Sequence, residues 1–288
     1  MTRPTVLVAG SLHHDIMVEA DHLPRRDETA IGRRWYPKFG GKGGNQAVAV
    51  ARAGADCRML GAVGDDAFGT YLRAGLQAGG VDDRFVATLP DVGSGMSVAI
   101  LDAAGDYAAT IVSGANLRID AAAVQNPAVW QDVGLLILQN EVAEAMNLAA
   151  ATEGKRRGVR TLLNAAPARA LPDAFVALVD ILVVNAVEAE MMGAGAVVDL
   201  ASAAAATRLL SDRFGSVIVT AGSLGLAAMT PDDGVFTLAA EKVQAVSSHG
   251  AGDAFVGTLG AGLARGIPFR AAVEAASRAA ARHVSGGS

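Results

Sequence analysis

The sequence has little cysteine, few aromatic residues and no excess of positive charge. Cys57 is the single cysteine, so no disulfide can form within the chain, and its place in a predicted strand indicates a buried thiol rather than a nucleophile. Aromatic residues make up 5% of the 288 residues, which argues against stacking platforms for nucleic acid. A formal net charge of −5 provides no field to attract polyanions. We therefore expect no nucleic-acid partner.

Long hydrophobic runs are also absent. No stretch approaches the roughly 20 apolar residues that a membrane-spanning helix needs, so no membrane partner is expected. The first apolar run, 5–9, is far too short for a signal peptide, and the cytoplasm is the expected location. Hydrophobic residues at 51% and charged residues at 18% are typical of a globular chain.

Short apolar runs alternate with alanine-rich stretches along most of the chain. Strands are predicted at 6–9, 57–62, 134–139, 160–163, 181–184 and 216–220, and helices at 46–53, 69–78, 141–157, 173–179, 188–192, 200–214, 254–264 and 269–284. Apolar strands separated by helices indicate a parallel sheet covered on both faces. The sequence thus predicts one α/β domain over 1–288, with a doubly wound, mostly parallel sheet.

Two segments, 15–38 and 97–113, interrupt this alternation. Half-exposed strand patterns at 16–19, 29–32, 97–101 and 107–112 predict a small β-sheet beside the main one. We interpret it as a lid over the strand ends, with a merely decorative hairpin as the alternative. Its exposed edge could pair with a second copy, which predicts a homodimer.

A glycine-rich segment, 40–44, surrounds Lys42 and leads into a predicted helix. Glycines let backbone amides approach a ligand, and a helix start adds positive potential. Gly43 stands where a P-loop needs serine or threonine, and Gln46 replaces the third glycine of a dinucleotide-binding turn, which argues against a nicotinamide dehydrogenase. We predict a polyol-binding loop in which Lys42 and Asn45 contact the substrate; an ordinary glycine turn is the alternative.

Small residues also lead into the helix that follows Asp253. Free amides at this helix start would form an anion hole for a transferring phosphate. The helix dipole would keep Asp253 ionised, and an ionised aspartate can accept a hydroxyl proton during phosphoryl transfer. A simple helix cap is the alternative for this residue.

Polar residues follow three other predicted strands. Asn185 and Glu188 follow the strand at 181–184, where Glu188 could hold a hydrated Mg²⁺; a capping box explains the same pair. Asp15 and Glu141 also follow strands, and their carboxylates could accept hydrogen bonds from vicinal hydroxyls. Each is otherwise an ordinary loop charge.

Taken together, these motifs resemble the ribokinase-like (PfkB) carbohydrate kinases over nearly the whole chain. The resemblance is carried by Gly10-Ser11 with Asp15, by the segments 40–47, 61–69 and 164–169, by Asn185 with Glu188, and by 250–253. It implies ATP and Mg²⁺ as cofactors and a β lid that often forms a dimer clasp. It implies sugar contacts from Asp15, Gly41, Asn45 and Glu141, with Asp253 as the base and an anion hole at Gly250, Ala251 and Gly252. It also implies nucleotide contacts from Asn185, Thr220, Gly222, His249 and Ser277, with Mg²⁺ near Asn185 and Glu188.

Three departures from the family pattern affect the expected substrate and ion dependence. His13 stands where ribokinases usually have asparagine; its imidazole can hydrogen-bond a sugar but is bulkier and titrates near neutrality. Ser247 replaces an aspartate that helps to hold potassium, and ribokinases continue beyond the position of Ser288. Potassium activation is therefore not expected.

The predicted function is transfer of the γ-phosphate of MgATP to a primary hydroxyl of a pentose, with D-ribose as the leading acceptor. A nucleoside, a hexose or a 2-keto-3-deoxy sugar acid is an alternative acceptor, and Arg33 and Arg34 could bind an acid's carboxylate. A catalytically weak paralog that binds sugar or nucleotide is the alternative of a different class.

Overall fold

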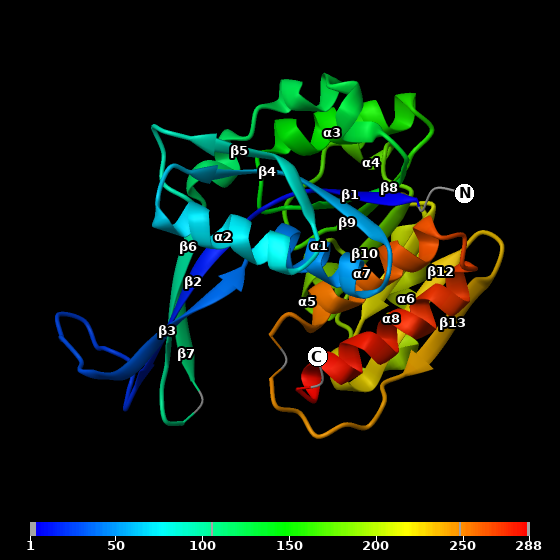
Figure 1. Ribbon diagram of the computed structural model, residues 1–288. Helices are drawn as coiled ribbons and strands as arrows, with labels where there is room; N and C mark the ends of the chain where they lie inside the picture. The colour runs from blue at the N-terminus through cyan, green and yellow to red at the C-terminus, as the bar shows by residue number, and fades with distance from the viewer. Residues whose placement is uncertain (1–3, 105, 248, 287–288) are drawn as a thin grey trace.

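The computed structural model describes residues 4–104, 106–247 and 249–286, which form two β-sheets and their covering helices (Figure 1). The larger sheet has, in spatial order and within these ranges, β13 (Gly234–Ala239), β12 (Gly225–Thr230), β11 (Ser216–Thr220), β10 (Ile181–Asn185), β9 (Arg160–Asn164), β8 (Val133–Gln139), β1 (Thr5–Ala9), β4 (Asp56–Gly64) and β5 (Asp82–Leu89). All pairs from β5 to β11 are parallel, whereas β12 and β13 are antiparallel. The predicted doubly wound, mostly parallel sheet is confirmed.

Helices cover both faces of the larger sheet, and each face has its own hydrophobic core (Figure 1). One face carries α1 (Lys42–Arg52), α2 (Ala67–Ala78), α7 (Ala251–Ala264) and α8 (Phe269–Val284). The other carries α3 (Glu144–Arg156), α4 (Asp173–Val176), α5 (Ala186–Met191) and α6 (Leu200–Ser211), with the short helices η1 (Gly114–Arg118), η2 (Ala121–Gln125) and η3 (Pro127–Trp130). The central strands are buried on both sides, which explains their unbroken apolar sequences. In the described ranges, no helix has the length and apolarity to cross a bilayer.

The smaller sheet projects from the main body at the lower left of Figure 1. Its order is β3 (Gly32–Gly40), β2 (His13–Ala20), β6 (Met96–Leu101) and β7 (Tyr107–Val112). The predicted strand at 29–32 is wrong, because β2 pairing ends at Ala20 opposite Gly32 and leaves 29–31 without a partner strand. The turn between β6 and β7 contains Gly105, which lies outside the described residues.

Three strands of the larger sheet escape sequence prediction, and several helix bounds differ. β5 and β13 are edge strands. The charged residues of β5 are tolerated at an edge, but they interrupt the apolar run by which a buried strand is predicted. β12 lies next to β13 in an antiparallel hairpin. The α1 helix begins at Lys42 and α7 at Ala251, each earlier than expected, so their glycines belong to the first helical turns. The α3 helix begins only at Glu144, which leaves Glu141 in the preceding loop.

Candidate active site

The strand order reverses between β1 and β8, and this reversal positions the candidate site. From β1 the chain continues outward through β4 and β5, and from β8 it continues the other way through β9 to β11. Ligands of open α/β sheets bind at such a reversal, beyond the carboxyl ends of the strands. Ser11 follows β1 and Glu141 follows β8, and Ser11 Oγ donates a hydrogen bond to Glu141 Oε2 at 2.5 Å. The backbone amide of Lys42 donates to the same oxygen at 2.9 Å. Glu141, an expected sugar ligand, is therefore oriented at the reversal point.

The glycines at the start of α1 let this helix pack directly on the loop after β1. Gly41 is the N-cap residue, with φ 85°, and a Cβ there would lie 2.7 Å from the amide nitrogen of His13. A Cβ on Gly43 would lie 2.6 Å from the amide nitrogen of Ser11. The close approach that these glycines permit is thus between segments of the chain itself. It brings Lys42 and Asn45 to the same place as Glu141.

Two further sugar-site candidates lie on β2, where the small sheet meets the large one. Asp15 is buried and accepts a hydrogen bond from Ser97 Oγ at 2.5 Å. His13 is also buried, and its Nδ1 lies 3.7 Å from Glu141 Oε2. The other ring nitrogen, Nε2, has no hydrogen-bond partner among the described residues. The small sheet therefore contributes one carboxylate and one imidazole beside Glu141.

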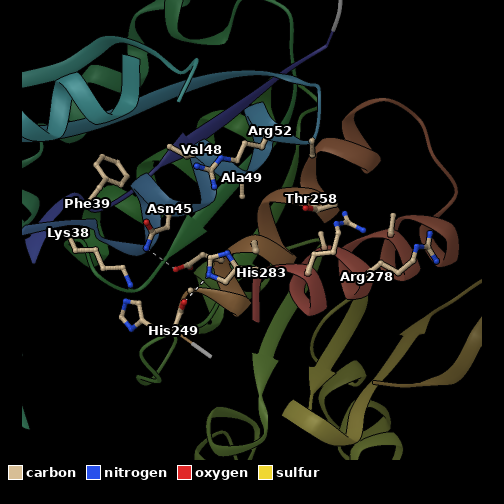
Figure 2. A pocket seen from close by; sticks show the side chains of 17 residues that line it. Lys38, Phe39, Asn45, Val48, Ala49, Arg52, His249, Thr258, Arg278 and His283 are labelled. Carbon is tan, nitrogen blue, oxygen red and sulfur yellow. Dashed lines mark hydrogen bonds between the residues drawn. The ribbon is translucent and has the colours of Figure 1, made fainter. Parts of the chain in front are cut away.

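Asp253 lies in the first turn of α7 and is not its cap. Gly250 holds the N-cap position in a left-handed conformation, so the simple capping alternative does not apply. Asp253 Oδ1 accepts a hydrogen bond from Gln46 Nε2 at 2.9 Å. Its Oδ2 accepts one from Asn45 Nδ2 at 3.3 Å, which Figure 2 marks with a dashed line from Asn45. Burial raises the pKa of Asp253 to about 6, while the charge of Lys42 and the two amide donors lower it. Desolvation outweighs the favourable contacts, so the pKa lies above its ordinary value although the carboxylate stands at a helix start. The group remains mostly ionised at neutral pH.

A buried chain of amide side chains supports Asp253, and sequence reasoning missed it. Gln139 Nε2, at the end of β8, donates to Gln46 Oε1 at 2.7 Å, and Gln46 in turn donates to Asp253. Asn147 Nδ2 on α3 donates to the backbone oxygen of Gln139 at 2.7 Å. These bonds tie α1, β8 and α7 together behind the carboxylate. The signal in the sequence was Gln46 directly after Asn45, which we had used only to exclude a dinucleotide turn.

A cavity of about 190 Å³ collects the residues predicted to bind phosphate and metal. Its lining includes Lys42, Asn185, Glu188, Thr220, Gly250, Gly252 and Asp253. Asn185 and Glu188 form a reciprocal capping box at the start of α5, with bonds of 2.8 and 2.9 Å. Burial raises the pKa of Glu188, and the hydrogen bond from the Asn185 amide and the charge of Lys42 oppose this rise.

The residues of this cavity fit a magnesium ion held mainly through water. Mg²⁺ keeps several waters and needs only one or two carboxylates beside the substrate phosphates, and Glu188 supplies one. The described residues contain no group of three or more His, Cys, Asp or Glu side chains arranged to hold a metal directly. Capping and metal binding by Glu188 are compatible, because one carboxylate oxygen remains free of the capping bond.

A second cavity, of about 650 Å³, lies between α1, α7 and α8 (Figure 2). Asn45, His249, Gly250 and Asp253 belong to its lining, so both cavities reach the same carboxylate. Burial lowers the pKa of His249, and the charge of Lys38 lowers it further. Ala251, Gly222 and Ser277, which were expected near the phosphates or the nucleotide, line neither cavity.

Comparisons with known proteins agree with this geometry. Residues 4–287 match the family model described as pfkB family carbohydrate kinase. Mouse ribokinase is 35% identical over 258 residues, covering 88% of this chain and 80% of the relative. A deoxyribokinase of Salmonella typhi is 32% identical, covering 98% and 92%. The structure of Arabidopsis thaliana ribokinase complexed with ribose and ATP superimposes with a TM-score of 0.89 at 25% identity, covering 99% and 93%.

The chain therefore belongs to the pfkB family of carbohydrate kinases, as the resemblance predicted. It is an enzyme that transfers phosphate to a sugar hydroxyl.

Proposed function

We propose that this protein is a ribokinase that transfers the γ-phosphate of MgATP to the primary hydroxyl of D-ribose. The observation that carries the proposal is the buried carboxylate of Asp253, held by Asn45 and Gln46 at the start of α7. It faces the phosphate-side cavity and lies close to the sugar-side residues at the strand-order reversal. A relative named ribokinase at 35% identity supports this acceptor.

In the proposed reaction, Asp253 orients the primary hydroxyl and accepts its proton as the oxygen bonds to the γ-phosphorus. The bond from that phosphorus to the bridging oxygen breaks, and ADP leaves. The transition state of such transfers is loose, so charge neutralisation and positioning contribute more than strong base catalysis. We assign the neutralisation to Lys42 and to the amides of Gly250, Ala251 and Gly252 at the start of α7.

The sugar and the nucleotide would approach Asp253 from opposite sides. On the sugar side, Asp15, Gly41, Asn45 and Glu141 are the proposed contacts, with His13 beside Glu141. On the nucleotide side, the proposed contacts are Asn185, Thr220, Gly222, His249 and Ser277. Glu188, with Asn185 beside it, would hold Mg²⁺ through water, and the ion would neutralise phosphate charge. An ATP complex of the Arabidopsis neighbour supports the choice of nucleotide.

A pentose other than ribose is the second candidate acceptor, and His13 is the observation that favours it. The buried imidazole beside Glu141 changes the hydrogen-bonding pattern of the sugar site. The Salmonella relative named deoxyribokinase covers 98% of the chain. The broader alternatives are a nucleoside, hexose or sugar-acid acceptor, and a weakly catalytic binding paralog.

We further propose that the small sheet, 15–38 and 97–113, serves as a lid and as a dimer contact in the cytoplasm. Trp35, Tyr36, Ile111 and Val112 on this sheet are exposed, with Trp35 at 66%. Exposed apolar side chains on a free sheet support pairing with a second copy.

We also propose that potassium does not activate the enzyme, because Ser247 offers only a neutral hydroxyl.

ADP release from purified protein with MgATP tests the function. The acceptor panel contains D-ribose, 2-deoxyribose, hexoses, nucleosides and a 2-keto-3-deoxy sugar acid, each in sodium or potassium buffer. Release with ribose at the highest kcat/KM, equal in both salts, supports the proposal. Faster release with another acceptor reassigns the substrate, and no release from protein that binds ATP favours the binding paralog.

A further inference from the structure

The cleft between α1, α7 and α8 has the size of a small-molecule site. It measures about 650 Å³, within the range of roughly 300–1,000 Å³ typical of small-molecule sites. Small side chains, including Ala49, Ala254 and Ala279, line it between the helices. Asn45 and Asp253 belong to its lining, as do Ala275, Arg278, Ala279 and Arg282 of α8.

Basic side chains from three separate elements line this cleft, with Lys38 beside His249 at one end and Arg278 toward the other (Figure 2). Lys38 comes from β3, Arg52 from α1, and Arg278 and Arg282 from α8. In the described parts of the chain, none of these four side chains forms an ion pair, whereas most of the other arginines do. Asp253 is the one acidic residue in the lining. In a chain of net charge −5, such a concentration of unpaired positive charge indicates an anionic ligand.

Ser277 and the two arginines of α8 lie on different faces of the helix, although the cleft and the smaller cavity share Gly250 and Asp253 in their linings. Arg278 and Arg282 are one turn apart, so they share a face of the helix with Ala275 and Ala279. Ser277, the residue proposed to contact the nucleotide, is about 100° around the helix from Arg278 and points away from that face. The smaller cavity is lined instead by Lys42, Glu188 and Thr220.

Two histidines lie at one edge of the cleft. His283 Nε2 lies 2.9 Å from the backbone oxygen of His249. Burial lowers the pKa of His249; the charge of Lys38 lowers it further, and the charge of Asp15 opposes this.

We propose that this cleft is a second anion site, which binds a phosphate group through Arg52, Arg278 and Arg282. Arginine guanidinium groups bind phosphate in a bidentate manner, and several cations suit a dianion better than a single carboxylate. The phosphate belongs either to a phosphorylated small molecule whose other end lies beside Asp253 or to free inorganic phosphate. The site does not depend on the identity of the acceptor.

Calorimetric titration of inorganic phosphate into the purified protein, without nucleotide or sugar, tests the site. The test variant is Arg278→Gln/Arg282→Gln, whose exposed side chains leave the core untouched. The matched control is Arg208→Gln, an exposed arginine on α6 without an ion pair among the described residues. Lys42→Gln reports phosphate that binds in the smaller cavity instead. Sodium chloride at matched ionic strength corrects for general screening.

We expect the double variant to weaken phosphate binding about tenfold or more, because charge-assisted contacts are lost, and Arg208→Gln to stay within about twofold. Unchanged affinity in the folded double variant, loss only in Lys42→Gln, or no saturable binding up to about 10 mM would each overturn the proposal. Ribose 1-phosphate, whose primary hydroxyl is free, identifies the source. Tighter binding than inorganic phosphate, with the same sensitivity to the double variant, assigns a phosphorylated ligand; equal binding assigns free phosphate.

Discussion

Gln46→Leu removes one hydrogen bond from the carboxylate of Asp253 without touching the substrate-facing loop. Gln46 is fully buried, and its Nε2 donates to Asp253 Oδ1 at 2.9 Å. A hydrogen bond to a charged group contributes about 1.5–3 kcal/mol, and 1.36 kcal/mol corresponds to one pH unit. Since the bond stabilises only the ionised form, its loss should move the titration of Asp253 upward by about 1–2 pH units.

The pH dependence of kcat/KM measures this shift. With a pKa of about 6 for Asp253, the wild-type value should fall about tenfold per pH unit below pH 6, because protonation removes the base. In Gln46→Leu the same fall should begin about 1–2 pH units higher, with a plateau at alkaline pH that approaches the wild type. Gln77→Leu is the matched control, because Gln77 also donates to a carboxylate, Asp83, but on α2 away from the site.

An acid limb of Gln46→Leu that coincides with the wild type, in folded protein, would refute the reasoning. It would mean that Gln46 does not set the ionisation of the base, or that another group is the base. Folding is checked separately by denaturant titration. Gln139 Nε2 loses its acceptor in the variant, so we expect a loss of about 1–3 kcal/mol in the free energy of unfolding.

Three further changes test other parts of the site. Asp253→Asn should lower kcat by about 10²–10⁴-fold with little change in nucleotide affinity. Because the pKa of Asp253 is raised, the free energy of unfolding of the wild type should fall as the pH rises from 3.8 to about 6. The variant cannot ionise at this position, so its free energy of unfolding should fall by roughly 1–3 kcal/mol less over the same pH range. Gly41→Ala, with its Cβ 2.7 Å from the His13 amide and φ at 85°, should lower kcat/KM and reduce stability by at least about 1 kcal/mol, measured by activity and chemical denaturation. Trp35→Lys should convert a dimer to a monomer in sedimentation velocity, and a wild type that is already monomeric would contradict the proposed clasp.

Local signals in the sequence were sufficient for the centre of the fold. The strands β1, β8 and β10 are apolar throughout because both of their faces are covered, so they were predictable as buried parallel strands. The edge strand β5 is missed because Asp82, Asp83 and Arg84 interrupt the apolar run that would indicate a buried strand. Helix starts were placed too late at α1 and α7, since glycines in a first turn look like a loop when only propensity is considered.

The candidate site was predictable where a residue type and its place after a strand both pointed to ligand binding. Glu141 is identified in this way, whereas Asn45 and Asp253 are identified by the glycine-rich segments that lead into their helices. The structure brings Asn45 and Asp253 within 3.3 Å although 208 positions separate them. The amide chain of Gln46 and Gln139 was not identified, because its two members become neighbours only when α1 packs beside the end of β8.

By itself, the sequence determined the class of fold and the chemical groups available for phosphoryl transfer, because periodicity and motif spacing are local properties of the chain. Only the tertiary structure decided how these groups act. The pKa of Asp253 depends on how deeply α7 packs and on which amides face it, and neither can be obtained from neighbouring residues. The basic cleft is likewise a product of packing, since Arg52 and Arg282 lie far apart in sequence and line one cleft only because α1 and α8 both pack against α7.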